Sequence, residues 1–186
     1  MKDSYEKGVF FQKDEDSIYC QGNYKVISSD ISDSSDISKN LSIKKDITIK
    51  KDITIQKDIV ITSDNMQKLN GKNKKITVDN NITLTLKNLK IEDLTIIVRE
   101  NGKINLYNNI ITNSRITLEA EEAEGAEGNF FNNVFDKDNE VDLKDNTKTL
   151  ILNNIFLDTN ISAQGDNLTA TGGFGSNRLD TKTKTK

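Results

Sequence analysis

The sequence predicts an all-β protein, a parallel β-helix (solenoid) with coils of about 20 residues. An isoleucine or valine returns at intervals of 20, 20, 25 and 20 residues, and a second apolar residue follows each one two positions later. The first column is Ile76, Ile96, Ile116, Val141 and Ile161, and the second is Val78, Val98, Leu118, Leu143 and Ala163. No helical apolar period accompanies the repeat. Each unit therefore buries its apolar face only by stacking on its neighbours.

The residues between the two columns indicate strands with one buried face. They are Thr77, Ile97, Thr117, Asp142 and Ser162, of which four are polar, so the columns point inward and these residues outward. A further apolar set leads each unit, namely Leu86, Leu106, Phe130 and Ile151. It is followed by Asn88, Asn108, Asn132 and Asn153, and then by Ile91, Ile111, Phe135 and Phe156. Because Asn tolerates left-handed backbone angles, we expect the Asn column at a bend, as an internal ladder of amides.

Residues 1–25 show no period, and we expect them to form an N-terminal cap over the first coil. The apolar residues available for a short strand or cap are Val9, Phe10, Phe11, Ile18 and Tyr19. A solenoid needs such a cover because an open strand edge templates aggregation. The alternative is a frayed end.

Residues 26–64 carry a shorter repeat of six residues, and we predict strands that lead into the larger coils. One column is Ile31, Ile37, Ile43, Ile49, Ile55 and Ile61, and the other is Leu41, Ile47, Ile53 and Ile59. The preferred interpretation is short strands at 47–49, 53–55 and 59–61, joined by Lys-Asp turns. A hexad is also one side of a coil in left-handed β-helices, so that three hexads complete a coil. The alternative is a low-complexity expansion with little structural meaning.

Residues 65–165 are predicted to form the β-helix coils. The segment LNGKNKKITVDNNITLTLKNLKI, at 69–91, resembles the opening of right-handed parallel β-helix repeats in bacterial surface proteins, including adhesins and autotransporter passengers. The similarity continues as INLYNNII at 104–111, FFNNVF at 130–135 and LILNNIF at 150–156. The resemblance implies a right-handed coil. It also implies a surface or adhesive role, although many unrelated proteins share such repeats.

Two polar segments interrupt the coils, and neither is predicted to hold a metal. EAEEAEGAEG, at 119–128, is expected to bulge as a solvated acidic loop, with a calcium site as the alternative. DKDNE, at 136–140, lacks the glycine of a calcium loop and is expected to be a turn. Residues 166–186 are Gly-rich and then alternate Thr with Lys, so we expect a flexible C-terminal tail.

Composition excludes several classes of function. The net charge of −3 gives no reason to bind nucleic acid, and no apolar run is long enough to insert in a membrane. The absence of histidine removes the commonest general base and metal ligand, and Cys20 has no partner for an internal disulfide. The first residues do not form a signal peptide. We therefore expect an extracellular or cell-surface piece of a longer exported chain, or alternatively a cytoplasmic protein.

The sequence points to no catalytic residue, cofactor or metal ligand. Arg99 and Arg115 fall at outward positions, where a solvated surface charge is expected, and no inter-coil pair of acids emerges from the register. Asp79, Arg99 and Glu119 share one exposed column, with Lys144 and Gln164 beyond, which indicates charge pairing between coils. Outward threonines such as Thr77 and Thr117 are ordinary strand residues rather than an ice-binding face, because Ile97 and Asp142 break their column.

We therefore expect a non-enzymatic surface or adhesion module. A rigid β-helix would present a face and loops to a host or neighbouring-cell protein or glycan. The alternative is a carbohydrate-active β-helix enzyme, a polysaccharide lyase or hydrolase, or its binding remnant. A groove with stacked acids and an arginine would favour the enzyme, whereas a smooth polar face would favour adhesion.

Overall fold

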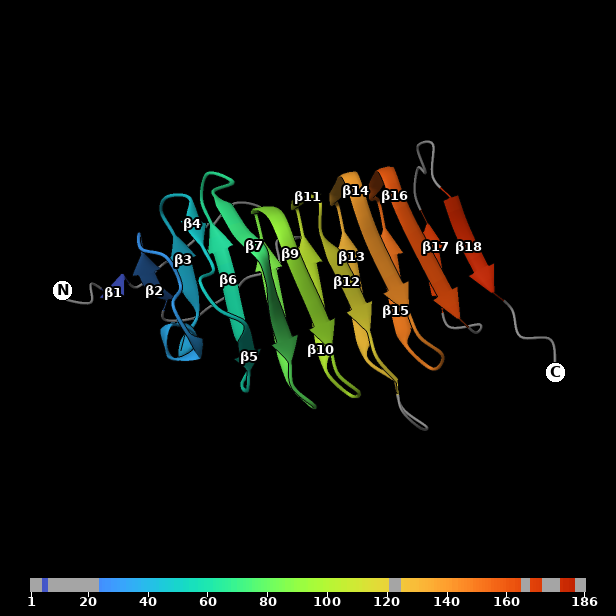
Figure 1. Ribbon diagram of the computed structural model, residues 1–186, viewed down its shortest axis with the longest axis horizontal. Coiled ribbons are helices and arrows are strands. Elements are labelled where there is room, and N and C mark those ends of the chain that lie inside the picture. Colours follow the sequence, from blue (N-terminus) through green and yellow to red (C-terminus); the bar gives the residue numbers. More distant parts are fainter. Residues whose placement is uncertain (1–4, 7–23, 121–124, 165–167, 172–177, 183–186) are drawn as a thin grey trace, which may run out of the picture.

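The computed structural model is a parallel β-solenoid of about six turns, each about 21 residues long, which confirms the predicted fold class. It describes residues 5–6, 24–120, 125–164, 168–171 and 178–182. Two sheets face each other along the solenoid axis, and the coils follow one another from the N-terminal to the C-terminal end (Figure 1). Apart from one 3-10 turn at Ser34–Ile37, the described residues contain no helix, and so none that could cross a membrane.

The first sheet contains one strand from each coil, in the order β1-β2-β3-β6-β8-β10-β13-β15-β17. These strands are β1 (Tyr5–Glu6), β2 (Tyr24–Ile27), β3 (Leu41–Ile43), β6 (Ile59–Ser63), β8 (Thr83–Lys87), β10 (Lys103–Tyr107), β13 (Glu127–Phe131), β15 (Lys148–Leu152) and β17 (Leu168–Thr171). All neighbours are parallel except β1 and β2, which pair antiparallel. The β1–β2 pair lies within the expected cap, whose residues 1–4 and 7–23 are outside the described part of the chain.

The second sheet contains the other two sides of each coil. Its main path is β18-β16-β14-β11-β9-β7-β4, with β12 paired to β14 and β9 and with β5 paired to β7. These strands are β4 (Ile47–Thr48), β5 (Ile53–Ile55), β7 (Lys68–Val78), β9 (Lys90–Val98), β11 (Ile110–Thr112), β12 (Arg115–Leu118), β14 (Val134–Leu143), β16 (Ile155–Gln164) and β18 (Arg178–Lys182). The long strands β7, β9, β14 and β16 run along both sides and bend between them.

The bends explain why the chain is rich in asparagine and has no proline. Fifteen described non-glycine residues have positive φ, and all except Met66, Lys72 and Lys137 are Asn or Asp. The predicted column Asn88, Asn108, Asn132 and Asn153 has φ of 53–57°, which confirms its place at a bend. Short polar side chains tolerate this left-handed conformation at low cost.

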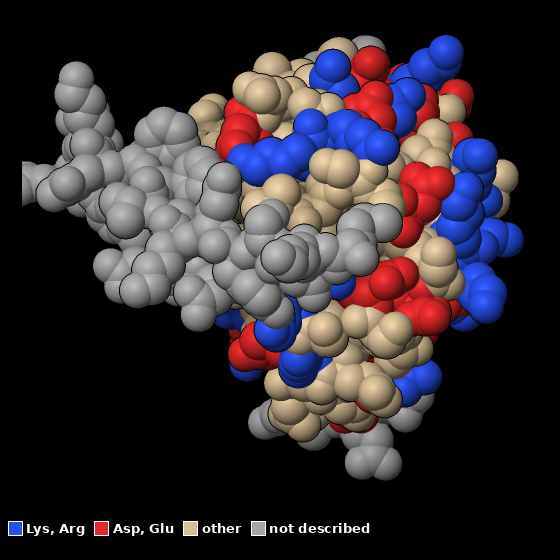
Figure 2. All heavy atoms as spheres, turned by 90° about the vertical axis from the view of Figure 1, so that its left-hand side faces the viewer, with Lys and Arg blue, Asp and Glu red and all other residues tan. Residues whose placement is uncertain are grey.

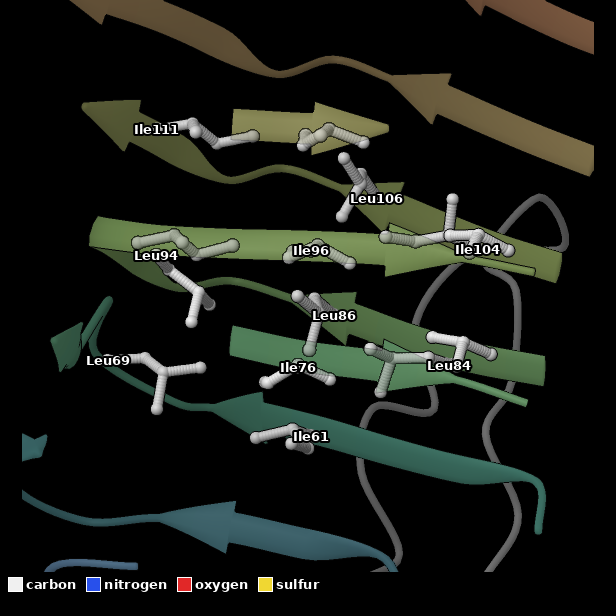
Figure 3. Packing of buried hydrophobic residues seen from close by; sticks show 14 of the residues in the cluster. Ile61, Leu69, Ile76, Leu84, Leu86, Leu94, Ile96, Ile104, Leu106 and Ile111 are labelled. Atoms are coloured by element: carbon white, nitrogen blue, oxygen red, sulfur yellow. The ribbon is translucent and has the colours of Figure 1, made fainter. Parts of the chain in front are cut away.

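The predicted columns lie in register from coil to coil. Ile96 pairs with Ile76 and Ile116, and Ile116 pairs with Val141, while Leu106 pairs with Leu86 and Phe130. These side chains are almost completely buried. Figure 3 shows Ile76, Ile96, Leu86 and Leu106 pointing into the space between the sheets. Burial of each isoleucine or leucine contributes about 1.5–3 kcal/mol, so the columns are the main source of stability.

The hexads form the first coils, as predicted. β3, β4 and β5 begin six residues apart, at Leu41, Ile47 and Ile53, and each forms one side of a coil. Both isoleucine columns are buried, which contradicts the low-complexity alternative. The aspartate of each Lys-Asp turn accepts a hydrogen bond from a backbone N–H one coil later, at 2.8 Å for Lys68 to Asp46, 3.0 Å for Lys75 to Asp52 and 2.8 Å for Thr83 to Asp58. Asp46, Asp52 and Asp58 therefore connect neighbouring coils at the turns, in addition to carrying surface charge.

The internal amide ladder lies one residue later than we predicted. Asn88, Asn108, Asn132 and Asn153 are partly or fully exposed, whereas Asn109, Asn133 and Asn154 are buried. In the inner ladder, Asn109 and Asn133 donate through Nδ2 to the Oδ1 of the next asparagine, at 3.1 and 2.9 Å. At each of these bends the residue with positive φ changes the direction of the chain, and the side chain of the next residue then points into the core. The exposed column keeps one such bond, from Asn153 Nδ2 to Asn132 Oδ1 at 2.6 Å.

The solenoid continues beyond residue 165, where we expected only a flexible tail. β17 pairs with β15, and β18 pairs with β16, with Leu179 opposite Ile161. The segment LTAT alternates apolar and polar residues, which is the period of a strand. The exposed edges of β15 and β16 provide backbone groups for such pairing. The remaining residues of this region lie outside the described part of the chain.

Candidate functional site

A polar groove of about 450 Å³ lies on the outer side of the second sheet. We call it the polar groove, and its lining residues are Lys75, Thr77, Asn80, Ile97, Arg99, Glu100 and Glu119. They come from three consecutive coils: β7 and the turn after it, β9 and the turn after it, and the residue that follows β12. The groove therefore exists only because residues 20 positions apart in the chain are stacked side by side.

Strand register builds the floor of the groove. Thr77 pairs with Ile97, and each lies between two inward residues of its strand, so both point outward. Lys75 lies two positions before Thr77 on the same face. Arg99 and Glu119 follow their strands in the next two coils, at the end where the chain turns back to the first sheet.

Two stacked turns form one wall. In each, a left-handed asparagine lies beside the groove, Asn81 with φ 59° and Asn101 with φ 56°. The second turn also requires Gly102, because a Cβ there would lie 2.9 Å from Arg99 O and 3.0 Å from Asp79 O. The Gly102 N–H donates to Arg99 O at 2.8 Å, and the Ile82 N–H donates to Asp79 O at 3.2 Å. These bonds hold the backbones that carry Asn80 and Glu100.

The charges of the groove are only partly neutralised by the protein itself. Arg99 Nη1 forms an ion pair with Asp79 Oδ1 at 2.9 Å, which confirms the predicted pairing between those two coils. Lys75, Glu100 and Glu119 form no ion pair with any other residue that the structure describes. The groove thus presents two cationic and two carboxylate side chains to solvent, together with the amide of Asn80.

Beyond Glu119, the predicted column of charges continues with an ion pair inside a single coil. Lys144 pairs with Asp142 of its own coil at 2.7 Å, so the alternation does not continue as an inter-coil stack at that point. Elsewhere coils are joined by pairs such as Arg115–Glu140 at 3.3 Å and Lys103–Glu127 at 3.1 Å. Figure 2, which views the N-terminal end, shows basic and acidic side chains next to one another there. Such exposed pairs contribute about 0–1 kcal/mol each.

No metal site was predicted, and no metal-binding group of three or more acidic, cysteine or histidine side chains occurs among the described residues. The calcium alternative concerns the acidic loop at 119–128, of which residues 121–124 lie outside the described part of the chain. Around these residues, Ala120 and Gly125 form an antiparallel bridge at the base of the loop. DKDNE is a bend within β14, as expected for a turn, with Lys137 and Asp138 left-handed and Asn139 buried.

Apolar side chains are also exposed outside the groove, on both sheets. Tyr107 and Phe131 stack on the outer face of the first sheet, with ring centroids 5.5 Å apart and an interplanar angle of 15°. Ile155 and Leu157 of β16 are the large apolar side chains most exposed among the described residues, at 49% and 40%.

Sequence reasoning anticipated the Asp79–Arg99 pair but not the groove around it. The outward column at Thr77 and Ile97 was visible in the sequence. The sequence did not show that Asn80 and Glu100 line the groove, because their positions depend on the path of two turns. The signal that could have indicated them is the pair of related segments VDNN and VREN, at 78–81 and 98–101, one coil apart.

The fold and the groove define the protein as a β-solenoid with a polar groove on one outer face. No protein-family model, curated protein or solved structure matches the chain.

Proposed function

We propose that the protein is a non-catalytic surface or adhesion module whose rigid solenoid presents the polar groove to a protein or glycan partner. The observation that supports this proposal is the groove itself, in which seven side chains from three coils surround one hollow. Three of the four charged side chains have no ionic partner among the described residues. They are therefore available to a ligand without breaking an ion pair of the scaffold.

The scaffold suits presentation of a fixed surface. Each groove strand is hydrogen-bonded to the coils on both sides, and the inward columns beneath it are buried. A ligand that meets a preorganised site does not have to order the protein on binding, which favours affinity. The cell-surface location and the bacterial adhesin-like character belong to this proposal and rest on the sequence resemblance.

The first experiment is a screen of the purified chain against a glycan array and a panel of polysaccharides and immobilised surface proteins, with and without calcium. Binding of any ligand should be reduced about tenfold or more by Lys75→Ala or Glu119→Gln, since each removes a charged contact. Lys148→Ala and Asp136→Asn, at exposed positions outside the groove, are matched controls. Binding that the groove variants leave unchanged would contradict the assignment of the groove.

The second candidate is a carbohydrate-active enzyme, and one observation favours it. Arg99 lies in the same groove as two carboxylates, Glu100 and Glu119, and paired carboxylates are the usual catalytic groups for glycoside hydrolysis. The same panel distinguishes this candidate, because an enzyme would shorten a polysaccharide and release new chain ends. Cleavage that Glu100→Gln and Glu119→Gln abolish would replace the non-catalytic proposal, whereas binding without cleavage would support it.

A further inference from the structure

The charges of the polar groove are ordered along the solenoid axis. Lys75 lies on β7, Arg99 follows β9 in the next coil, and Glu119 follows β12 one coil further on. Glu100 lies on the turn after Arg99. The groove therefore passes from a cationic end to an anionic end. Because neighbouring strands are about 4.8 Å apart, Lys75 and Glu119 are separated by about 10 Å along the axis. Lys75 lies in register with Arg115, four residues before Glu119, which adds about 13 Å along the strands and brings the separation to about 16 Å.

The ion pair between Arg99 and Asp79 determines which charges of the groove remain without an ionic partner in the described part of the chain. Asp79 occupies one side of the guanidinium, so Lys75 is the cation at this end without an ionic partner. At the other end, Glu100 and Glu119 both lack one among the described residues. A complementary ligand would place an acidic group over Lys75 and a basic group over the two glutamates.

From this order of charges we infer that the groove binds an extended peptide segment of a partner protein, with an acidic and a basic side chain a few residues apart. The inference rests on the proposed function and specifies its partner. An extended chain rises about 3.3 Å per residue, so a span of about 16 Å corresponds to a spacing of roughly five residues. Thr77 and Asn80 can both donate and accept hydrogen bonds, as a peptide backbone requires.

The composition of the groove favours a peptide over a glycan. Ile97 is its one large apolar side chain, and no aromatic ring lines it. A sugar ring would therefore find no aromatic face on which to stack. A neutral or uniformly charged glycan would also leave charges at one or both ends of the groove without a counter-charge.

The test measures the affinity of labelled Gly-Ser peptides by fluorescence anisotropy. One peptide carries Glu and Lys five positions apart, and the others carry Glu and Glu, Lys and Lys, or Gln and Gln at the same positions. The mixed peptide should bind at least about tenfold more tightly than the other three, and 0.5 M salt should weaken it. Equal binding of all four peptides would overturn the inference.

Charge reversal in the protein provides the sharper test. Lys75→Glu makes the groove mainly anionic, so that preference should move to the Lys-Lys peptide, and Glu119→Lys should move it to the Glu-Glu peptide. The double variant has the opposite polarity, and it should bind the mixed peptide again because a linear peptide can enter in the reverse direction. Lys148→Glu, outside the groove, should change none of these preferences.

Two further outcomes separate this inference from the proposed function. If no peptide binds but a glycan does, and the single reversals abolish that binding, then the groove is a glycan site and the peptide inference is wrong. If neither peptides nor glycans nor surface proteins bind, then both the inference and the proposed function fail.

Discussion

Asn133 is a buried residue that forms hydrogen bonds to the coils on both sides of its own. Its backbone N–H and its Nδ2 both donate to Asn154 Oδ1, at 2.8 and 2.9 Å, and Nδ2 also donates to Leu106 O at 2.9 Å. Its Oδ1 accepts from the backbone N–H and Nδ2 of Asn109, at 2.9 and 3.1 Å. The side chain therefore satisfies backbone groups at a buried corner, which would otherwise be costly.

Asn133→Ala should lower the free energy of unfolding by about 2–4 kcal/mol, because it removes the buried side-chain hydrogen bonds to the Asn109 N–H, the Leu106 carbonyl and Asn154 Oδ1. Denaturant unfolding followed by circular dichroism measures the change. Asn132→Gly is the matched control, since Asn132 is exposed and left-handed, and glycine adopts that conformation freely. A loss in Asn133→Ala no larger than in the control would contradict the role of the inner ladder.

Thr149 presents the opposite case, a buried hydroxyl with no hydrogen-bond partner in the structure. It occupies the inward column of the first sheet, next to Gly128 and beyond Ile104. Replacement by valine keeps the shape and removes the unsatisfied group, so Thr149→Val should raise the free energy of unfolding by about 1 kcal/mol.

Thr147→Val is the control for this substitution. Thr147 is also buried, but its Oγ1 donates to Lys144 O at 2.8 Å. Its replacement should therefore destabilise the protein by about 1 kcal/mol. Thermal unfolding of the two variants measures both changes. Shifts of the same sign would show that hydrogen bonding does not distinguish the two threonines.

The corner between the first two coils contributes a pH-dependent element. Asp30 forms an ion pair with Lys50 at 2.7 Å and accepts the Thr48 N–H at 2.8 Å. The hydrogen bond from the Lys50 side chain, followed by that from the Thr48 backbone, lowers the pKa of Asp30 below its ordinary value of 3.8. The ionised form is thus favoured by folding.

The sign of the pH effect follows from that shift. The stability that ionised Asp30 contributes is fully present above the unfolded pKa, near 3.8, and it is lost as the pH falls through the lower folded pKa. Asp30→Asn should therefore reduce stability at pH 7, and the difference from the parent should shrink below about pH 3.8. Unfolding curves at several pH values test this, with Asp136→Asn as an exposed control. A difference that grows on acidification would contradict the assigned direction.

At the scale of elements, the sequence was sufficient to predict the positions and orientation of the strands. It was not sufficient to predict the conformation of the turns between them. The period of two residues places Ile96 and Val98 inward and Ile97 outward, since a strand has no other choice. The hexads that begin at Leu41, Ile47, Ile53 and Ile59 likewise define one strand each, whereas the hexad before them forms a 3-10 turn at Ser34–Ile37. Corners have no such period, and so the inner ladder at Asn109 and Asn133 was placed one residue too early.

The groove was not predictable for a related reason. Its floor follows from strand register, but the wall depends on two turns whose conformation is set by Asn81, Asn101 and the close packing of Gly102 against Asp79 O. Local sequence indicates that turns occur there. It does not indicate how their side chains stand relative to the outer face of the sheet. The sequence shows how many charged side chains the groove region contains. Their order along the solenoid axis becomes known only when the coils are stacked in the structure.

At the scale of the whole molecule, stability depends on contacts between neighbouring coils. In such a stack, each coil gains its burial from the coil before and the coil after it. Ile116 lies on β12, between Ile96 of β9 and Val141 of β14, and is 1% exposed. A charge at this point would interrupt the apolar column between the N-terminal and C-terminal coils.

Ile116→Asp should therefore abolish the single cooperative unfolding transition, because it buries a carboxylate without a partner in the middle of the stack. Thr117→Lys is the matched control, since Thr117 is the next residue, points outward and lies opposite Asp142. It should unfold as the parent does. Calorimetry and circular dichroism of both variants would decide, and an Ile116→Asp protein that melts like the parent would contradict the register. Two separate transitions would show, in addition, that the coils on either side of β12 can fold as independent units.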